Sequence, residues 1–178
     1  MFWKLYPYEY VESVFDIDYT KLYQAGYRGL LFDVDNTLVH HGDDSTPEVD
    51  ELFRQVQKIG FRTLLLTDNT EERVKRFIRN IDTPYLCEAG KPDPSAYRRA
   101  AEILHLENSQ LVCIGDQLFT DILGANRSGI SSILVRFIRL PAETRIGKKR
   151  QLEKAILWFY QRNPSATHRL GNIQKEGQ

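Results

Sequence analysis

The chain has 178 residues, and its 24 Lys and Arg balance 24 Asp and Glu, so the formal net charge is zero. This length corresponds to about one domain, and the lack of net positive charge argues against a nucleic-acid-binding protein. No run reaches the roughly 18 apolar residues that would span a bilayer, and the N-terminus lacks the pattern of a signal peptide. We therefore expect a cytoplasmic protein in which Cys87 and Cys113 are buried thiols.

Short apolar runs alternate with amphipathic segments along the chain. The apolar runs have polar ends and are typical of buried strands, whereas the amphipathic segments begin with Ser, Thr or Pro and carry apolar residues at helical spacing. This alternation predicts a doubly wound α/β fold, a parallel sheet of about five strands with helices on both faces. The strand-like stretches lie in 27–35, 61–69, 83–94, 109–121 and 130–138, and the helices in 45–60, 70–81, 94–106 and 121–129.

Polar residues gather at the predicted strand ends. In chain order they are Asp33, Asp35, Thr67, Lys91, Asp116 and Asp121. In an open parallel sheet, ligands bind outside the carboxyl ends of the strands. Two carboxylates about 4 Å apart repel by roughly 4 kcal/mol at an effective dielectric of 20, so the acids need a cation. Oxygen ligands suit Mg²⁺, and a lysine and a hydroxyl beside them suit an anion. The pattern predicts a magnesium-assisted phosphate site.

Four motifs carry a family resemblance. They are DVDNTL from Asp33, LLLTDN around Thr67, AGKPDP around Lys91 and IGDQLFTD from Ile114 to Asp121. In order and spacing they resemble the haloacid dehalogenase (HAD) superfamily of aspartate-nucleophile phosphatases. The stretches 13–39 and 115–129 further resemble its YqeG-type subfamily, which is similar to the mitochondrial phosphatidylglycerophosphate phosphatases. The resemblance covers about residues 5–140 and implies a HAD-like hydrolase that uses Mg²⁺ in phospholipid metabolism.

The resemblance implies a role for each site residue. Asp33 would be the nucleophile that forms an aspartyl phosphate, and Asp35 the general acid and then the general base. Thr67 would hold the phosphoryl oxygens, and Lys91 would neutralise them. Asp116 would ligate Mg²⁺ together with Asp33 and the backbone carbonyl of Asp35. Asp121 would orient a metal-bound water or Lys91.

One position departs from the subfamily pattern, which usually reads Ser-Asn-Asn where this chain reads Thr67-Asp68-Asn69. Asp68 would contribute its backbone N–H to the phosphate while its carboxylate points away. The departure bears on substrate preference more than on catalysis.

Other sites with acids at strand ends fit less well. An EF-hand loop starting at Asp33 would need Gly and Glu where the chain has Leu38 and Asp44. A receiver domain would need its acceptor Asp on the third strand, and a P-loop kinase would need GxxxxGK[ST]. A phosphate-binding relative without activity remains an alternative. His40 and His41 are expected to be solvated loop residues.

The gaps between the motifs bear on the substrate. About one helix and one strand separate Asp33 from Thr67, and Thr67 from Lys91, which leaves no room for a cap domain with its own core. An open site suits a bulky substrate, such as a lipid head group or a macromolecule, or a site that a partner subunit covers in an oligomer.

The two ends flank a core at 29–140. The aromatic-rich segment 1–28 is predicted to pack on that core, as a strap over the sheet edge or as an interfacial contact. Residues 141–178 are predicted to form an amphipathic helix, with Leu152, Ile156 and Phe159 on one face, and a loose tail. Basic residues cluster at the start of this helix, namely Arg145, Lys148, Lys149, Arg150 and Lys154. The helix either docks on the domain or lies on anionic lipid as a peripheral membrane contact.

Three functions remain open from the sequence. The first is a phosphatase acting on phosphatidylglycerophosphate, and the second is the same chemistry on a soluble sugar phosphate or nucleotide. The third is a non-catalytic module that binds a phosphorylated small molecule.

Overall fold

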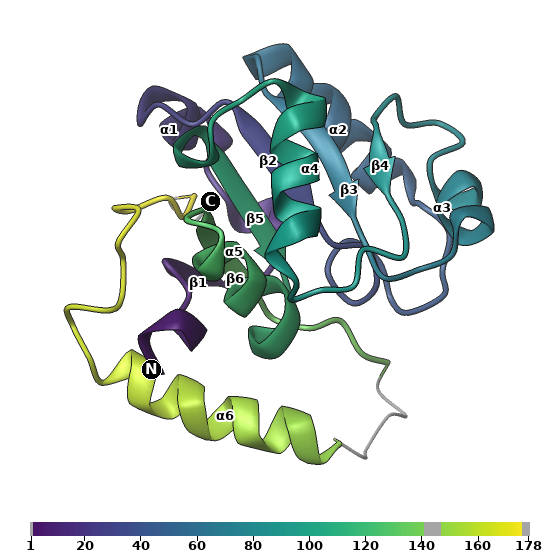
Figure 1. The fold of residues 1–178 in the computed structure, drawn as a ribbon. Helices are drawn as coiled ribbons and strands as arrows, with labels where there is room; N and C mark the ends of the chain where they lie inside the picture. The colour runs from purple at the N-terminus through teal and green to yellow at the C-terminus, as the bar shows by residue number, and fades with distance from the viewer. Residues whose placement is uncertain (1, 141–146, 176–178) are drawn as a thin grey trace.

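A six-stranded, wholly parallel sheet forms the centre of the computed structural model, which describes residues 2–140 and 147–175 (Figure 1). The strand order is β1-β6-β5-β2-β3-β4. The strand that precedes Asp33 therefore lies between those that precede Asp116 and Thr67. The bounds are β1 Glu9–Val11, β2 Gly29–Phe32, β3 Arg62–Leu66, β4 Tyr85–Leu86, β5 Leu111–Gly115 and β6 Ser131–Val135.

The helices begin where the sequence supplies capping residues. The side chains of Thr46, Thr70 and Asp93 accept hydrogen bonds from backbone N–H groups in the first turns of α2, α3 and α4, which satisfies donors that a helix leaves free at its start. The bounds are α1 Tyr19–Gln24, α2 Pro47–Ile59, α3 Glu71–Phe77, α4 Pro94–Leu104, α5 Leu123–Arg127 and α6 Lys148–Gln161, with a π-helical turn at Leu118–Ile122.

The strands send alternate side chains to two apolar layers. From β2, Leu30 and Phe32 pack with α2 and α3 on one face, while Leu31 packs with α4 and α5 on the other. Helices on both faces explain why these strands are apolar without interruption. The expected doubly wound fold is confirmed. Residues 33–91 contain α2 and α3 but no additional domain, so the site has no cap.

The sheet has six strands where we expected about five. Glu9–Val11 in the N-terminal segment forms β1 and pairs in parallel with β6; three residues are too few to carry a periodic pattern. The tail is also more ordered than expected. Ile173 is buried, and its carbonyl accepts a hydrogen bond from the Asp18 N–H at 2.6 Å. Cys87 and Cys113 are free thiols, and Cys113 is buried as predicted. Cys87, which follows β4, is only half-buried, so its predicted burial is wrong.

Helix α6 lies beside the N-terminal turn (Figure 1), and its Ile156 packs with Leu118 and Ile122 of the π-helical turn. Its buried residues are Glu153, Ile156 and Tyr160, whereas Leu152 and Phe159 are exposed. The prediction that Leu152, Ile156 and Phe159 form one apolar face is therefore wrong, because the buried face of the helix combines a charged, an aliphatic and an aromatic side chain. Arg145, the first of the predicted basic cluster, lies outside the described residues.

Candidate active site

Three buried carboxylates and one lysine meet at the carboxyl end of the sheet. Asp33 follows β2, Asp116 follows β5, and Asp121 lies in the π-helical turn. One oxygen from each carboxylate lies within 4.8 Å of the others. Lys91 Nζ bridges two of them, at 2.8 Å from Asp33 Oδ1 and 2.6 Å from Asp121 Oδ1. The fold therefore brings together four of the residues that the motifs single out.

Neighbouring residues fix the positions of these carboxylates. Thr37 Oγ1 lies 3.3 Å from both Asp33 Oδ2 and Asp116 Oδ1 and so bridges the two acids. Asp121 Oδ2 accepts the N–H of Gln117 at 3.1 Å. The Asp121 side chain packs directly on Gly115, where an added Cβ would lie 2.4 Å from Asp121 Cγ. A residue larger than glycine at position 115 would displace the acid.

The pKa values of the clustered side chains reflect their burial and the excess of carboxylates over cations around them. Burial raises the pKa of Asp33 to about 8, with Asp121 and Asp116 adding to the shift and Lys91 opposing it. Burial and Asp121 raise the pKa of Asp116 to about 6 against the effect of Arg150. Burial lowers the pKa of Lys91, but the negative charges of Asp121 and Asp33 outweigh this effect and raise the pKa well above the usual value. The cluster is short of positive charge.

Asp35 faces a different set of partners. Its Oδ1 lies 3.2 Å from Arg73 Nη2 on α3 and accepts the N–H of Gly42 at 3.3 Å. Its Oδ2 lies 3.0 Å from Nδ1 of His41, whose side chain is otherwise exposed. The sequence analysis did not connect Arg73 with the site, because the two lie 38 residues apart and no motif joins them.

Thr67 and Asp68 form the edge of the site next to β4. Thr67 is buried, and its hydroxyl oxygen accepts hydrogen bonds from the backbone N–H and side-chain amide of Asn69 at 3.2 and 2.9 Å. The exposed Asp68 turns its Oδ1 to the backbone N–H of Lys91 at 3.0 Å. Asp68 thereby ties this loop to the loop of Lys91. Among the described residues, the Thr67 hydroxyl forms hydrogen bonds with Asn69 and none with the acid cluster.

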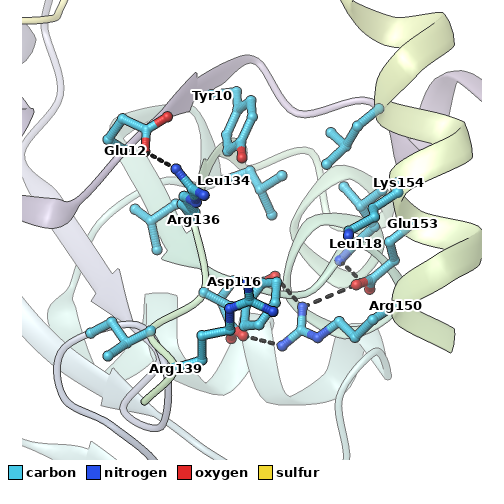
Figure 2. Close-up of a pocket in the computed structure, with 14 residues that line it drawn as sticks. Tyr10, Glu12, Asp116, Leu118, Leu134, Arg136, Arg139, Arg150, Glu153 and Lys154 are labelled. Atoms are coloured by element: carbon cyan, nitrogen blue, oxygen red, sulfur yellow. Dashed lines mark hydrogen bonds and ion pairs between the residues drawn. The ribbon is translucent and has the colours of Figure 1, made fainter. Parts of the chain in front are cut away.

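Arg150 of α6 also belongs to this region, which the sequence analysis did not foresee. Its Nη1 donates to the Asp116 backbone carbonyl at 2.6 Å and to Glu153 Oε2 at 3.0 Å, while Nη2 contacts Asp116 Oδ2 (Figure 2). Glu153 in turn accepts the N–H of Leu118 at 2.9 Å. The basic cluster of α6 is therefore not wholly directed to solvent. No spacing signal could reveal this contact, because it depends on how α6 docks.

The donor set fits a hard divalent cation. In the part of the chain that the structure describes, Lys91 and Arg150 are the cations paired with the three converging carboxylates. This leaves an excess of negative charge, which a small oxygen-ligated cation such as Mg²⁺ would balance. The raised pKa values of Asp33 and Asp116 express the same deficit.

Comparison with known proteins defines the family. A family model described as HAD-hydrolase-like matches residues 88–137. Over 175 residues the chain is 36% identical to "Probable phosphatase YqeG" of Bacillus subtilis strain 168, an alignment that covers 96% of this chain and 95% of that protein. The chain belongs to the YqeG family of HAD-like phosphatases. The predicted family and its phosphatase class are thus confirmed.

Two more distant matches accompany this YqeG-family assignment. The chain is 25% identical over 162 residues to "Phosphatidylglycerophosphate phosphatase 1, chloroplastic/mitochondrial" of Arabidopsis thaliana. The alignment covers 85% of this chain and 47% of that protein, so the chain spans about half of that protein's length. The structure of NagD from E. coli K-12 superposes with a TM-score of 0.54 at 13% identity, over 68% of this chain and 94% of that one. The match to NagD shows that the two chains share a fold.

Proposed function

We propose that this YqeG-family phosphatase hydrolyses a phosphomonoester through an aspartyl phosphate on Asp33 and requires Mg²⁺. The observation that carries the proposal is the contact of Asp33 with Lys91 at 2.8 Å beside two further buried acids. A carboxylate at the end of a central strand, with a fixed cation next to it, is suited to attack phosphorus and to have its charge balanced as the bond forms.

The steps use the roles that the family resemblance implies for the two acids. The Asp33 carboxylate attacks phosphorus, and the bond from phosphorus to the leaving alcohol oxygen breaks as Asp35 gives that oxygen a proton. A water then attacks phosphorus and gives a proton to Asp35, and the bond from phosphorus to the Asp33 oxygen breaks. Phosphate is released, with Asp33 again a carboxylate and Asp35 again protonated. Lys91 holds the phosphoryl oxygens, and the Thr67 loop donates hydrogen bonds to them.

The carboxylates of Asp33 and Asp116 and the backbone carbonyl of Asp35 would hold Mg²⁺, with Asp121 orienting their surroundings. When bound, the ion supplies positive charge to the phosphoryl group in the transition state.

For the substrate we propose phosphatidylglycerophosphate, in phospholipid synthesis. Two observations support it: the resemblance to the Arabidopsis protein of that name, and the lack of a cap, which leaves the site open to a head group in a membrane surface. The expected cytoplasmic location remains a prediction.

The outer face of α6 supports a peripheral membrane contact. Leu152, Trp158 and Phe159 are exposed there by 56%, 48% and 60%, and Lys148 and Lys149 are exposed at the helix start. The only acid of the helix, Glu153, is buried. Exposed aromatic groups and lysines on one helix favour the boundary of an anionic bilayer. Among the described helices, none is long and apolar enough to cross a membrane.

A substrate panel tests the proposal. Purified protein should release phosphate from para-nitrophenyl phosphate and from phosphatidylglycerophosphate in mixed micelles, and both activities should disappear with EDTA and return with Mg²⁺. Asp33→Asn should be inactive on both, while Asp82→Asn, in the exposed loop before β4, should keep wild-type rates. Wild-type turnover by pure Asp33→Asn would rule out the nucleophile. Turnover of sugar phosphates or nucleotides but not of the lipid would favour a soluble substrate. No turnover of any phosphomonoester would favour a binding module.

A further inference from the structure

We propose that a cavity beside Asp116 is the leaving-group site of this phosphatase, and that it selects an alcohol carrying a second anionic group. The inference rests on the proposed function and deepens it, because it specifies which phosphomonoesters the open site prefers. The cavity has a volume of about 600 Å³ and lies between α6, β1 and the chain that continues from β6 (Figure 2). That volume is within the range of ligand sites for small molecules.

Asp116 forms the wall between the cavity and the catalytic carboxylates. Its Oδ1 faces Thr37 and, through that hydroxyl, Asp33. Its Oδ2 faces Arg150, which lines the cavity. A substrate whose phosphoryl group sits at Asp33 can therefore extend its alcohol past Asp116 into this space.

The opposite wall is attached to the active-site loop. The segment after β6 contributes Phe137, Ile138 and Arg139 to the cavity, and the Ile138 N–H donates to the Asn36 carbonyl at 2.9 Å. Asn36 directly follows Asp35, the proposed proton donor to the leaving oxygen. The cavity wall is thus hydrogen-bonded to the loop that carries the proposed proton donor.

The charges of the lining suit an anion. Its four basic residues are Arg136, Arg139, Arg150 and Lys154, and its three acids are Glu12, Asp116 and Glu153. Arg136 pairs with Glu12 at 3.0 Å, and Arg150 pairs with the other two acids. No acid of the described chain lies within ion-pair distance of Arg139 or Lys154. These two exposed cations leave a net positive lining, and a phosphate oxygen is the group they would bind.

The remaining lining is apolar and suits a carbon skeleton. Leu134, Leu157 and the ring of Tyr10 form walls between the basic residues. A glycerol unit that carries a phosphodiester would place its carbons against these walls and its second anion near Arg139 and Lys154. A small alcohol without that anion would leave both cations without a partner.

Two soluble substrates test this inference without a membrane. sn-Glycerol 3-phosphate and glycerophosphoglycerol phosphate present the same phosphomonoester on glycerol, and only the second carries a phosphodiester. The wild type should show a kcat/KM about tenfold or more higher for the second, since charge-assisted bonds to phosphate are among the strong ones. In the double variant Arg139→Gln/Lys154→Gln the ratio of the two kcat/KM values should fall towards one, mainly because the KM for glycerophosphoglycerol phosphate rises.

A matched control removes two cations elsewhere. Lys58→Gln/Arg99→Gln changes exposed residues of α2 and α4 outside the cavity and should keep the wild-type ratio. Calorimetry on Asp33→Asn gives a second readout, because glycerophosphoglycerol phosphate should bind about tenfold more weakly once Arg139 and Lys154 are also replaced. A wild-type ratio near one, or equal binding with and without the two cations, overturns the inference. If no phosphomonoester is hydrolysed, the proposed function fails, and the calorimetry alone decides whether the cavity binds the anion.

Discussion

Arg150 and Asp116 connect the C-terminal helix to the active site. The guanidinium of Arg150 donates to both the backbone carbonyl and the carboxylate of Asp116, and it also binds Glu153. Asp116 and Glu153 are 4% exposed each, so Arg150 is the cation that compensates two buried acids. Helix α6 is thereby part of the site and not only a cover for the sheet.

The first prediction concerns the stability that this contact provides. Arg150→Gln should lower the free energy of unfolding in EDTA by about 2 kcal/mol, below the usual cost of a broken buried pair because Arg150 is partly exposed. Urea unfolding followed by circular dichroism measures it. Arg136→Gln, which breaks the exposed pair with Glu12, should cost less than about 1 kcal/mol. Equal effects of the two substitutions would contradict a structural role for Arg150.

The second prediction concerns the proton donor. Asp35→Asn should slow hydrolysis of an alkyl phosphate by about 10²–10⁴-fold, because the leaving alkoxide loses its acid. The loss should be smaller for para-nitrophenyl phosphate, whose leaving group needs less protonation. Steady-state kinetics on both substrates measures the difference. An equal loss on both would assign Asp35 a role other than proton transfer.

The third prediction concerns pH and the metal-free protein. The folded-state pKa values of Asp33, about 8, and Asp116, about 6, lie above the value of 3.8 for an unperturbed Asp. The folded state then binds more protons than the unfolded state between about pH 4 and 8, so these groups make stability fall as pH rises through that window. In EDTA, the urea concentration at which half of the protein is unfolded should be lower at pH 8 than at pH 5. Asp33→Asn should flatten this dependence, and a wild-type slope in the variant would contradict the assignment.

The fourth prediction concerns the membrane. Each basic residue near an anionic surface contributes about 1 kcal/mol, so Lys148→Gln/Lys149→Gln should weaken binding to phosphatidylglycerol vesicles by about 2 kcal/mol at low salt, or roughly 30-fold. Arg150 is left unchanged because it contacts Asp116. Co-sedimentation measures binding, with Lys58→Gln/Arg99→Gln as the control. If the wild type shows no preference for anionic over neutral vesicles, the proposed contact of the lysines with anionic lipid is excluded.

Local signals in the sequence were enough to predict strands β2 to β6 and helices α2 to α6. Apolar runs, the capping residues Thr46 and Thr70 and helical spacing depend on neighbours a few residues away, so they can be identified without a structure. β1 and the docking of Ile173 could not, since each is short and held by partners distant in the chain.

The family and the order of the four motifs can be identified from the amino-acid sequence, and the motifs converge because parallel strands bring their carboxyl ends to the same edge whatever the details of packing. They led to Asp33, Lys91, Asp116 and Asp121, which the structure brings into one cluster. Which charges balance that cluster depends on the tertiary structure. Arg150 is 34 residues from Asp116 and Arg73 is 38 from Asp35, and a charged side chain finds its partner through the packing of whole helices, which no local pattern encodes.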